Sequence, residues 1–490
     1  MSKYPKIIFD YLRGFDPDRD LDLILINTPL ISYPSNNHKP KDLVPPLGLG
    51  SLATCCKQAG YNVGLLDAEL FQLTIEEIVQ IICSCNPFAV GLSCVSPTIG
   101  VGCEIVERLP RNIPVIFGGP HVTLMPHLTM LKSNRIDFII RSEAEFSLPA
   151  LLFQLKTKRE YSCVDGLSYR FDGKITHNKN SELIEKLDGL PFIDRSFFAN
   201  DLKTKNGLES ALITSRGCCY DCIFCSEPIL NKKRIRRRSP ENVINEMKYL
   251  NSEFGVNYFH FMDDHFTLNR KWLERFCLLI ENSGLKVKWR ALSRVDSIDE
   301  EILRLMRNNG CELLAFGIES CSDIILEKIG KKITFKQIKK AIYLCHRVGI
   351  QTKGFFMIGF PFETEKDIDF TINSAKTLGL NSAVFNIVRA FPGTVLFEKM
   401  LGTFELSDLV EYEEFPTISD YGENQFFNAG LSKSGQNNLF AKGKVSLIGL
   451  EKLRESYNVS NKKNISPLGL EKLKEKLQVA AAGFYGDLNT

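Results

Sequence analysis

Short apolar segments alternate with helix-length segments along most of this chain, and that alternation restricts the fold more than any other feature. Apolar runs joined by helical connections pair as parallel strands, because a parallel strand needs a long crossover. Five such runs are predicted first, at 21–27, 62–67, 89–93, 115–118 and 138–141. Six more are predicted further on, at 210–215, 257–263, 286–294, 311–318, 350–358 and 382–389. The predicted fold class is therefore α/β.

The two series predict two different domains. Residues 20–156 are predicted to form a doubly wound parallel sheet with helices on both faces. Residues 206–400 repeat strand and helix, which predicts a partial (β/α)6 barrel with its chemistry at the carboxyl ends of the strands. A connector at 157–205 alternates apolar and polar residues around Asp172 and Gly173, a pattern typical of a hairpin.

The C-terminal region at 401–490 is predicted to be helical. Two similar segments, 447–454 and 467–474, have the pattern of amphipathic helices, and two copies are too few for a solenoid. A lid over the site and plain packing against the barrel are both open interpretations of this region.

Composition and charge exclude several classes of protein. With 490 residues, 44% of them hydrophobic, the chain can form about two to four folded domains and is not disordered. The net charge of +3 argues against nucleic-acid binding, and the basic run at 232–238 is interpreted as a solvated loop or a helix-entry cluster. The sequence lacks the roughly 18 consecutive apolar residues of a transmembrane segment, and it lacks a signal-peptide core. We therefore expect a cytoplasmic protein, and its 15 cysteines fit a reducing compartment.

Three cysteines with a short, regular spacing follow the strand predicted at 210–215. Cys218, Cys222 and Cys225 form the pattern Cys-x3-Cys-x2-Cys. Three thiolates on one loop can hold three irons of a four-iron cluster and leave the fourth iron free to bind another molecule. The alternative is that they are packing residues in a cysteine-rich chain.

This spacing, with the aromatic Phe224 just before the last cysteine, resembles the motif of the radical S-adenosylmethionine superfamily. The resemblance implies a 4Fe-4S cluster whose open iron binds the amino and carboxylate groups of S-adenosylmethionine. Reductive cleavage of that cofactor then gives a 5'-deoxyadenosyl radical. The resemblance also implies an electron donor such as flavodoxin or ferredoxin.

Polar residues at the predicted strand ends of the barrel extend the resemblance. It implies that Asp263 or Asp264 contacts the methionyl amino group and that Glu319 contacts the ribose. Arg294 has the planar fork to pair with the carboxylate of the cofactor, and an internal ion pair with Asp296 or Glu319 is the equal alternative.

Ligands of doubly wound sheets bind at the carboxyl ends of the strands. In the first domain the residues predicted there as cofactor-binding are Asp67, Ser93, Gly118, Gly119, His121 and Glu143. With the segment 44–50, they make this domain resemble the cobalamin-binding domain that precedes the radical domain in one subgroup of the superfamily. The resemblance implies a corrin above the sheet edge, although a tight turn alone also explains the glycine pair.

The loop after Asp67 departs from the pattern of cobalamin domains that supply a histidine ligand. Those domains carry Asp-x-His-x2-Gly, whereas this chain reads Asp-Ala-Glu-Leu-Phe-Gln from Asp67 onward. We therefore expect bound cobalamin to lack a histidine lower ligand. His121 is predicted either to shape its loop or to touch the rim of the corrin.

The resemblance implies a cobalamin-dependent radical S-adenosylmethionine enzyme, in the first place a C-methyltransferase acting on an unactivated carbon of a small-molecule or secondary-metabolite substrate. The main alternative is an oxidative cyclase or ring-rearranging enzyme with the same cofactors, similar to the tetrapyrrole cyclases. A tRNA methylthiotransferase is a weaker alternative, because it would bring a cysteine triad in the first domain and a C-terminal β-barrel. A non-enzymatic cobalamin sensor would leave the cysteine loop without a purpose. No catalytic side chain is predicted beyond those that hold cofactors.

Overall fold

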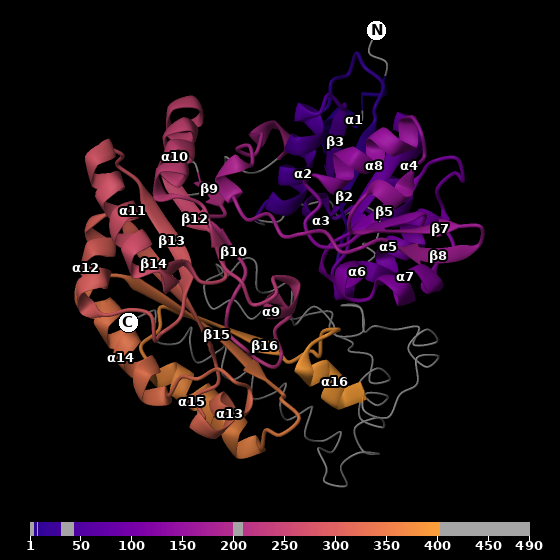
Figure 1. Cartoon of the computed structure of the whole chain (residues 1–490). Helices are drawn as coiled ribbons and strands as arrows, with labels where there is room; N and C mark the ends of the chain where they lie inside the picture. The colour runs from indigo at the N-terminus through magenta and orange to yellow at the C-terminus, as the bar shows by residue number, and fades with distance from the viewer. Residues whose placement is uncertain (1–3, 7, 31–43, 199–208, 402–490) are drawn as a thin grey trace. The chain divides into compact units, whose positions relative to one another are not determined.

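The computed structural model describes residues 4–6, 8–30, 44–198 and 209–401 (Figure 1). The described residues up to 198 form one compact unit, and those from 209 form another. The α/β fold class is confirmed. The helical region predicted at 401–490 lies, after its first residue, outside the described residues. Within the described ranges, no helix is long and apolar enough to cross a membrane.

The first unit contains one sheet with the strand order β1-β3-β2-β4-β5-β6-β7-β8. Strands β2 to β6 are parallel, so the predicted doubly wound sheet is confirmed. Its strands are β1 (Leu12–Arg13), β2 (Leu23–Asn27), β3 (Val63–Asp67), β4 (Ala89–Ser93), β5 (Val115–Gly118), β6 (Phe138–Ile140), β7 (Leu167–Phe171) and β8 (Lys174–His177). Its α-helices are α1 (Ile8–Tyr11), α2 (Leu47–Gln58), α3 (Ala68–Phe71), α4 (Ile75–Cys85), α5 (Ile99–Glu107), α6 (Pro120–Leu124), α7 (Pro126–Lys132) and α8 (Ser147–Lys156).

The hairpin of β7 and β8 lengthens this sheet. Asp172 and Gly173 link the two strands, and both have positive φ angles, +48° and +69°, as a two-residue type I′ turn requires. Strand β7 also pairs antiparallel with β6. The hairpin predicted in the connector is therefore part of the first sheet, while the domain limits at 156, 205 and 400 stay predictions.

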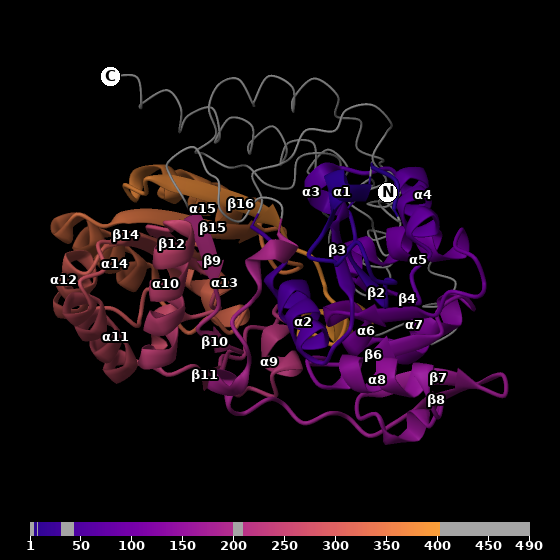
Figure 2. The ribbon, with the colours of Figure 1, turned by 90° about the horizontal axis from the view of Figure 1, so that it is seen from above.

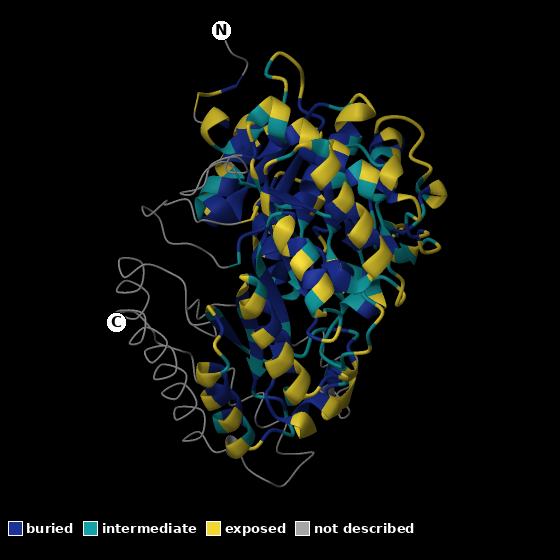
Figure 3. Cartoon of the chain, turned by 90° about the vertical axis from the view of Figure 1, so that its left-hand side faces the viewer, coloured by how far each residue is buried: buried dark blue, intermediate teal, exposed yellow. Residues whose placement is uncertain are grey.

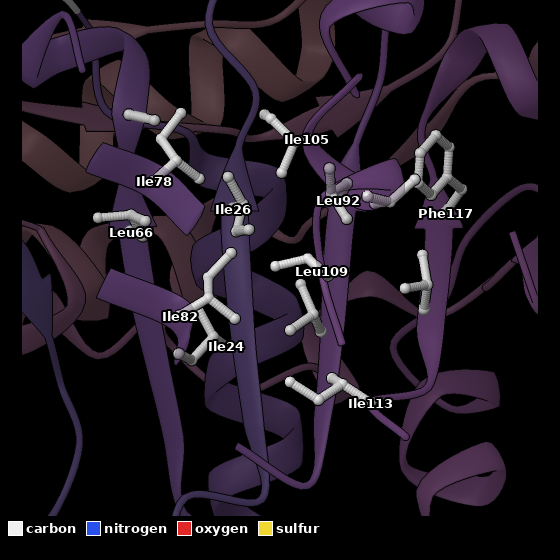
Figure 4. Packing of buried hydrophobic residues seen from close by; sticks show 14 of the residues in the cluster. Ile24, Ile26, Leu66, Ile78, Ile82, Leu92, Ile105, Leu109, Ile113 and Phe117 are labelled. Carbon is white, nitrogen blue, oxygen red and sulfur yellow. The ribbon is translucent and has the colours of Figure 1, made fainter. Parts of the chain in front are cut away.

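The core of the first unit follows from strands that are apolar on both faces and from helices that are apolar on one. Ile24 and Ile26 of β2 are buried, as parallel strands covered on both sides require. Helix α4 places Ile78 and Ile82 one turn apart on the same face, and these side chains pack over β2 and β3 (Figure 4). A capping box between Thr74 and Glu77 fixes the start of that helix.

The second unit contains a six-stranded sheet in the order β16-β15-β14-β13-β12-β9. All neighbouring strands are parallel, which confirms the predicted partial (β/α)6 barrel. The strands are β9 (Glu209–Leu212), β12 (Tyr258–Phe261), β13 (Lys288–Ser293), β14 (Cys311–Glu319), β15 (Gln351–Ile358) and β16 (Ser382–Ile387). The helices are α9 (Glu227–Leu230), α10 (Pro240–Phe254), α11 (Arg270–Ser283), α12 (Glu300–Asn308), α13 (Asp323–Lys328), α14 (Phe335–Val348), α15 (Glu365–Thr377) and α16 (Val395–Leu401). Helices α10, α11, α12 and α14 lie together along one side of the sheet (Figures 1 and 2).

Alternation along the strands gives this sheet two different faces. Phe259 and Phe261 of β12 are buried, and Phe261 lies 4.6 Å from Phe266 and 5.5 Å from Phe276 of α11, measured between ring centroids. Because side chains alternate along a strand, Tyr258 and His260 belong to the opposite face. Figure 3 shows buried residues along the strands and exposed residues along the outer side of the helices.

Candidate functional site

The three predicted cluster cysteines lie on one loop of the second unit. Cys218, Cys222 and Cys225 stand between the short strand β10 (Ser215–Arg216) and helix α9, and all three are half-buried. Strand β10 pairs antiparallel with β11 (Arg236–Arg237), so both ends of the loop region are tied together. Burial raises the pKa of all three thiols, that of Cys225 to about 12. Iron binding at these thiols would therefore release protons.

Backbone contacts fix the shape of this loop. Gly217 has a φ of +95°, and a Cβ there would lie 2.2 Å from the carbonyl oxygen of Arg234, so only glycine fits. The backbone amide of Ile223 donates to the carbonyl of Ile329 at 3.0 Å, and that of Leu396 donates to Ile223 at 2.9 Å. The cysteines are thus held by contacts from distant parts of the barrel.

The donor set fits an iron–sulfur cluster better than a single ion. Across the described ranges, no three His, Cys, Asp or Glu side chains converge as the ligands of one metal ion. In a four-iron cluster each cysteine binds a different iron, so the sulfurs do not have to meet at one point. Three soft ligands on one restrained loop match that requirement.

Phe224 anchors the same loop. Its ring centroid lies 5.8 Å from that of Phe360, a fully buried residue that follows β15. The aromatic that precedes the last cysteine therefore packs against the fifth strand of the barrel.

The two adjacent acids after β12 have different environments. Asp263 is buried and accepts hydrogen bonds from the backbone amide of Thr214 at 2.6 Å, the hydroxyl of Ser215 at 2.6 Å and the hydroxyl of Thr214. These bonds join the ends of β9 and β12. Asp263 therefore has a structural role, whereas Asp264 is the member of the pair that meets the cysteine loop.

Asp264 accepts a hydrogen bond from the backbone of Gly217 and shares one with Glu227. Burial and the charge of Asp263 raise the pKa of Asp264, and burial and the charge of Asp264 raise the pKa of Glu227 to about 7. Each carboxylate therefore favours the protonated form of the other beside the loop. Sequence reasoning missed Glu227, although it stands two positions after Cys225 at the start of a helix.

Arg294 lies against the cysteine loop with its hydrogen-bonding fork already occupied. Its guanidinium donates to both oxygens of Asp296, at 3.0 and 2.9 Å, and to the carbonyl of Lys331 at 2.7 Å. The guanidinium carbon also lies 3.7 Å from the ring centroid of Tyr220, which stands between the first two cluster cysteines. Of the two predicted roles, the structure contains the internal ion pair with Asp296.

We predict that Arg294 holds the loop through Tyr220. Arg294→Ala should lower the free energy of unfolding by about 1–2 kcal/mol, because it removes the hydrogen bonds to Asp296 and to the carbonyl of Lys331 and the stack on Tyr220. It should also change the electron paramagnetic resonance spectrum of the reduced cluster, and Arg294→Lys should restore charge but not the stack. Arg304→Ala, at an exposed arginine of α12, is the matched control. An unchanged spectrum in Arg294→Ala would contradict a role in positioning the loop.

Glu319 ends β14 in an unusual backbone conformation. Its φ is +67°, a value rarely adopted by residues with a side chain, and the pairing with β15 shifts between Gly317 and Glu319. The ammonium of Lys331 donates to Glu319 at 2.8 Å, and both side chains are about nine-tenths buried. A Cβ on Gly317 would lie 2.7 Å from the Glu319 carboxylate, so glycine leaves the room for this pair.

The structure brings these residues together around Cys222. The charges of Lys331 and Arg294 lower the pKa of Cys222 against the larger effect of burial, and the charge of Glu319 raises it. Lys331 was not predicted from the sequence, because it lies on a loop after α13 and belongs to no strand end. The buried ammonium of Lys331 and the buried carboxylate of Glu319 therefore lie beside the cysteine loop.

The first unit aligns its predicted residues along one edge of the sheet. Asn27 pairs in register with Asp67 on one side and Ser93 on the other, and Ser93 pairs with Gly118. Asn27 donates to the Asp67 carboxylate at 2.7 Å, and the same carboxylate caps α3 through the amide of Leu70. Asp67, Ser93 and Gly118 thus end three strands at the same level.

Gly119, His121 and Glu143 lie just beyond that edge, His121 in the first turn of α6. Gly119 has a φ of +102°, and a Cβ there would lie 2.6 Å from the carbonyl of Cys94. His121 is buried with Nδ1 3.0 Å from the hydroxyl of Ser96, and burial lowers its pKa to about 4, which keeps the ring neutral. Glu143 accepts a hydrogen bond from the backbone of Ile184 at 2.7 Å.

Comparisons with known proteins agree with both units. Residues 36–152 match the B12 binding domain family, and residues 212–375 match the radical SAM superfamily. An uncharacterized methyltransferase of Pyrococcus horikoshii is 36% identical over 358 residues, which are 72% of this chain and 78% of the relative. An anaerobic magnesium-protoporphyrin IX monomethyl ester cyclase of Synechocystis is 29% identical over 71% of this chain and 70% of the relative.

A solved structure has the same fold. The radical S-adenosylmethionine methyltransferase of Kitasatospora setae, with cobalamin and a 4Fe-4S cluster bound, aligns with a TM-score of 0.63 and 18% identity over 79% of this chain and 76% of its own. In this chain the doubly wound sheet comes first, and the barrel with its cysteine loop follows. The chain therefore belongs to the cobalamin-binding-domain subgroup of the radical S-adenosylmethionine superfamily, whose cofactors are a 4Fe-4S cluster, S-adenosylmethionine and cobalamin.

Proposed function

We propose that the protein is a C-methyltransferase that adds a methyl group to an unactivated carbon of a small-molecule substrate. The observation that carries this proposal is the restrained three-cysteine loop beside the buried pair of Glu319 and Lys331, in a chain that also has a B12 binding domain. Methyltransferases among the relatives support it. When bound, the cofactors supply the radical that activates the substrate and the methyl group that is transferred.

The side chains of the barrel would hold and orient these groups. Cys218, Cys222 and Cys225 would each bind one iron. Asp264 would accept a hydrogen bond from the amino group of S-adenosylmethionine, since Asp263 is occupied by Thr214 and Ser215. Glu319 would accept hydrogen bonds from the ribose hydroxyls. A proton held between Asp264 and Glu227 would keep the total negative charge beside the cluster low.

Isotope labelling tests the reaction. Anaerobically reconstituted protein with a chemical reductant, S-adenosylmethionine carrying a deuterated methyl group and a metabolite extract should yield a product that contains one labelled methyl. The cyclase relative favours oxidative cyclisation as the second candidate. That reaction would give a product that has lost hydrogens and carries no label, with 5'-deoxyadenosine formed in both cases. A product without label would overturn methyl transfer.

We further propose that the protein works in the cytoplasm with an electron donor such as flavodoxin or ferredoxin. All 15 cysteines lie in the described part of the chain, and none forms a disulfide. A reducing compartment keeps such thiols available for iron.

We predict that cobalamin binds without a histidine lower ligand. The loop after Asp67 carries Glu69 and Leu70 in place of histidine, and His121 is buried within α6. Cobinamide has no nucleotide base that could itself act as the lower ligand. The electron paramagnetic resonance spectrum of protein-bound cob(II)inamide should therefore show no nitrogen superhyperfine splitting. Splitting that disappears in His121→Ala would identify His121 as the ligand and contradict this prediction.

A further inference from the structure

Three nitrogen-bearing side chains lie on one face of the barrel sheet, opposite the face on which Phe261 packs against Phe266 and Phe276. His260 of β12 pairs in register with Arg290 of β13, and Lys353 belongs to β15. Their strand neighbours Phe259, Trp289 and Thr352 are buried on the helix side. Because side chains alternate along strands, His260, Arg290 and Lys353 share the inner face.

The positive charge of this group exceeds its negative charge. Glu209 forms an ion pair with Arg290. Lys353 has no carboxylate partner among the residues that the structure describes, and its ammonium lies 5.2 Å from the ring centroid of Phe355. A half-buried ammonium without a counter-charge is costly, so a group that supplies one would bind favourably.

Two further nitrogens on this face lack hydrogen bonds. Nε of Arg290 and Nδ1 of His260 are buried and have no partner within the described ranges. Burial lowers the pKa of Lys353 and, with Arg290 and Lys353 nearby, that of His260 to about 3. The neutral imidazole can place its proton on Nδ1 and donate it. The inner face therefore contains two unpartnered donors beneath an unbalanced positive charge.

We propose that His260, Arg290 and Lys353 form a binding site for an anionic oxygen group of the substrate, a carboxylate or a phosphate. Arg290 lies within β13, and Arg294 directly follows the end of that strand. Their separation of four positions corresponds to a distance of about 13 Å along the strand. Arg294 contacts the cysteine loop through Tyr220. The site would thus hold one end of the substrate while the reacting carbon of the substrate lies near the strand ends. Holding the substrate in this orientation would increase the reaction rate. This inference rests on the proposed function, of which it names the substrate class.

Inorganic phosphate and succinate serve as probes on the full-length reconstituted protein. We expect either anion to raise the Tm by about 3 °C or more relative to sodium chloride of equal ionic strength. Lys353→Met should abolish that rise and should raise the Tm in anion-free buffer, because it removes an unpaired charge. Lys288→Met is the control, since Lys288 pairs with Glu312 on the same sheet. An equal rise in the unmutated protein and Lys353→Met, or no rise with either anion, would overturn the proposal.

A second measurement needs no variant. Acylation of the unmutated protein, followed by mass spectrometry, should show that phosphate or succinate protects Lys353 and leaves Lys288 unaffected. Equal labelling of Lys353 with and without both anions would contradict the site. Neither measurement requires turnover, so a failure here leaves methyl transfer to be judged by the labelled product alone.

Discussion

Replacement of Cys218, Cys222 and Cys225 together by alanine is expected to abolish iron binding and the cleavage of S-adenosylmethionine. Each of the three cysteines would supply the only protein ligand to one iron, and Cys219, which stays on the loop, cannot replace all three. The fold should survive, because the three thiols are only half-buried and the loop is fixed by backbone contacts. Iron analysis, the visible absorption of the reconstituted protein and 5'-deoxyadenosine formation measure the loss.

Cys219→Ala is the matched control. Cys219 is exposed, stands next to Cys218 and falls outside the spacing. This variant should bind a full complement of iron and form 5'-deoxyadenosine at the unmutated rate. Retention of iron and cleavage activity in the triple variant would show that the cluster is held elsewhere.

The strands were predictable because parallel strands are apolar on both faces. The segments predicted at 89–93 and 115–118 have the same limits in β4 and β5. The strand predicted at 286–294 is shorter in the structure, where β13 ends at Ser293 and the side chain of Arg294 turns to Asp296 and Tyr220. The strand thus stops just before the polar side chain that contacts the cysteine loop.

The contacts of the site were less predictable, because they join segments that are distant in sequence. Asp263 and Asp264 are adjacent and alike in chemistry, yet in the loop after β12 the first accepts hydrogen bonds from Thr214 and the second from Gly217 of the cysteine loop. Lys331 lies 12 residues after its partner Glu319. No periodicity links those two positions, so only the folded chain reveals the pair.

Glu319→Gln is expected to reduce S-adenosylmethionine binding by about tenfold or more, because a charge-assisted hydrogen bond to the ribose contributes about 1.5–3 kcal/mol. The same change should lower the free energy of unfolding by about 3 kcal/mol, since Lys331 loses its buried partner. Titration of the cofactor and denaturant unfolding measure the two effects separately. Cobalamin affinity should stay unchanged, because the B12 binding domain match ends at residue 152.

The double variant Glu319→Gln/Lys331→Met separates a cofactor contact from a structural role. It removes both charges of the buried pair, so most of the lost stability should return, because no uncompensated charge stays buried. If Glu319 contacts the ribose, the stable double variant will still bind S-adenosylmethionine weakly and form little 5'-deoxyadenosine. Lys331→Met alone keeps the carboxylate and should retain more of that affinity than Glu319→Gln. Normal 5'-deoxyadenosine formation in the double variant would show that Glu319 serves the fold and that another residue binds the ribose.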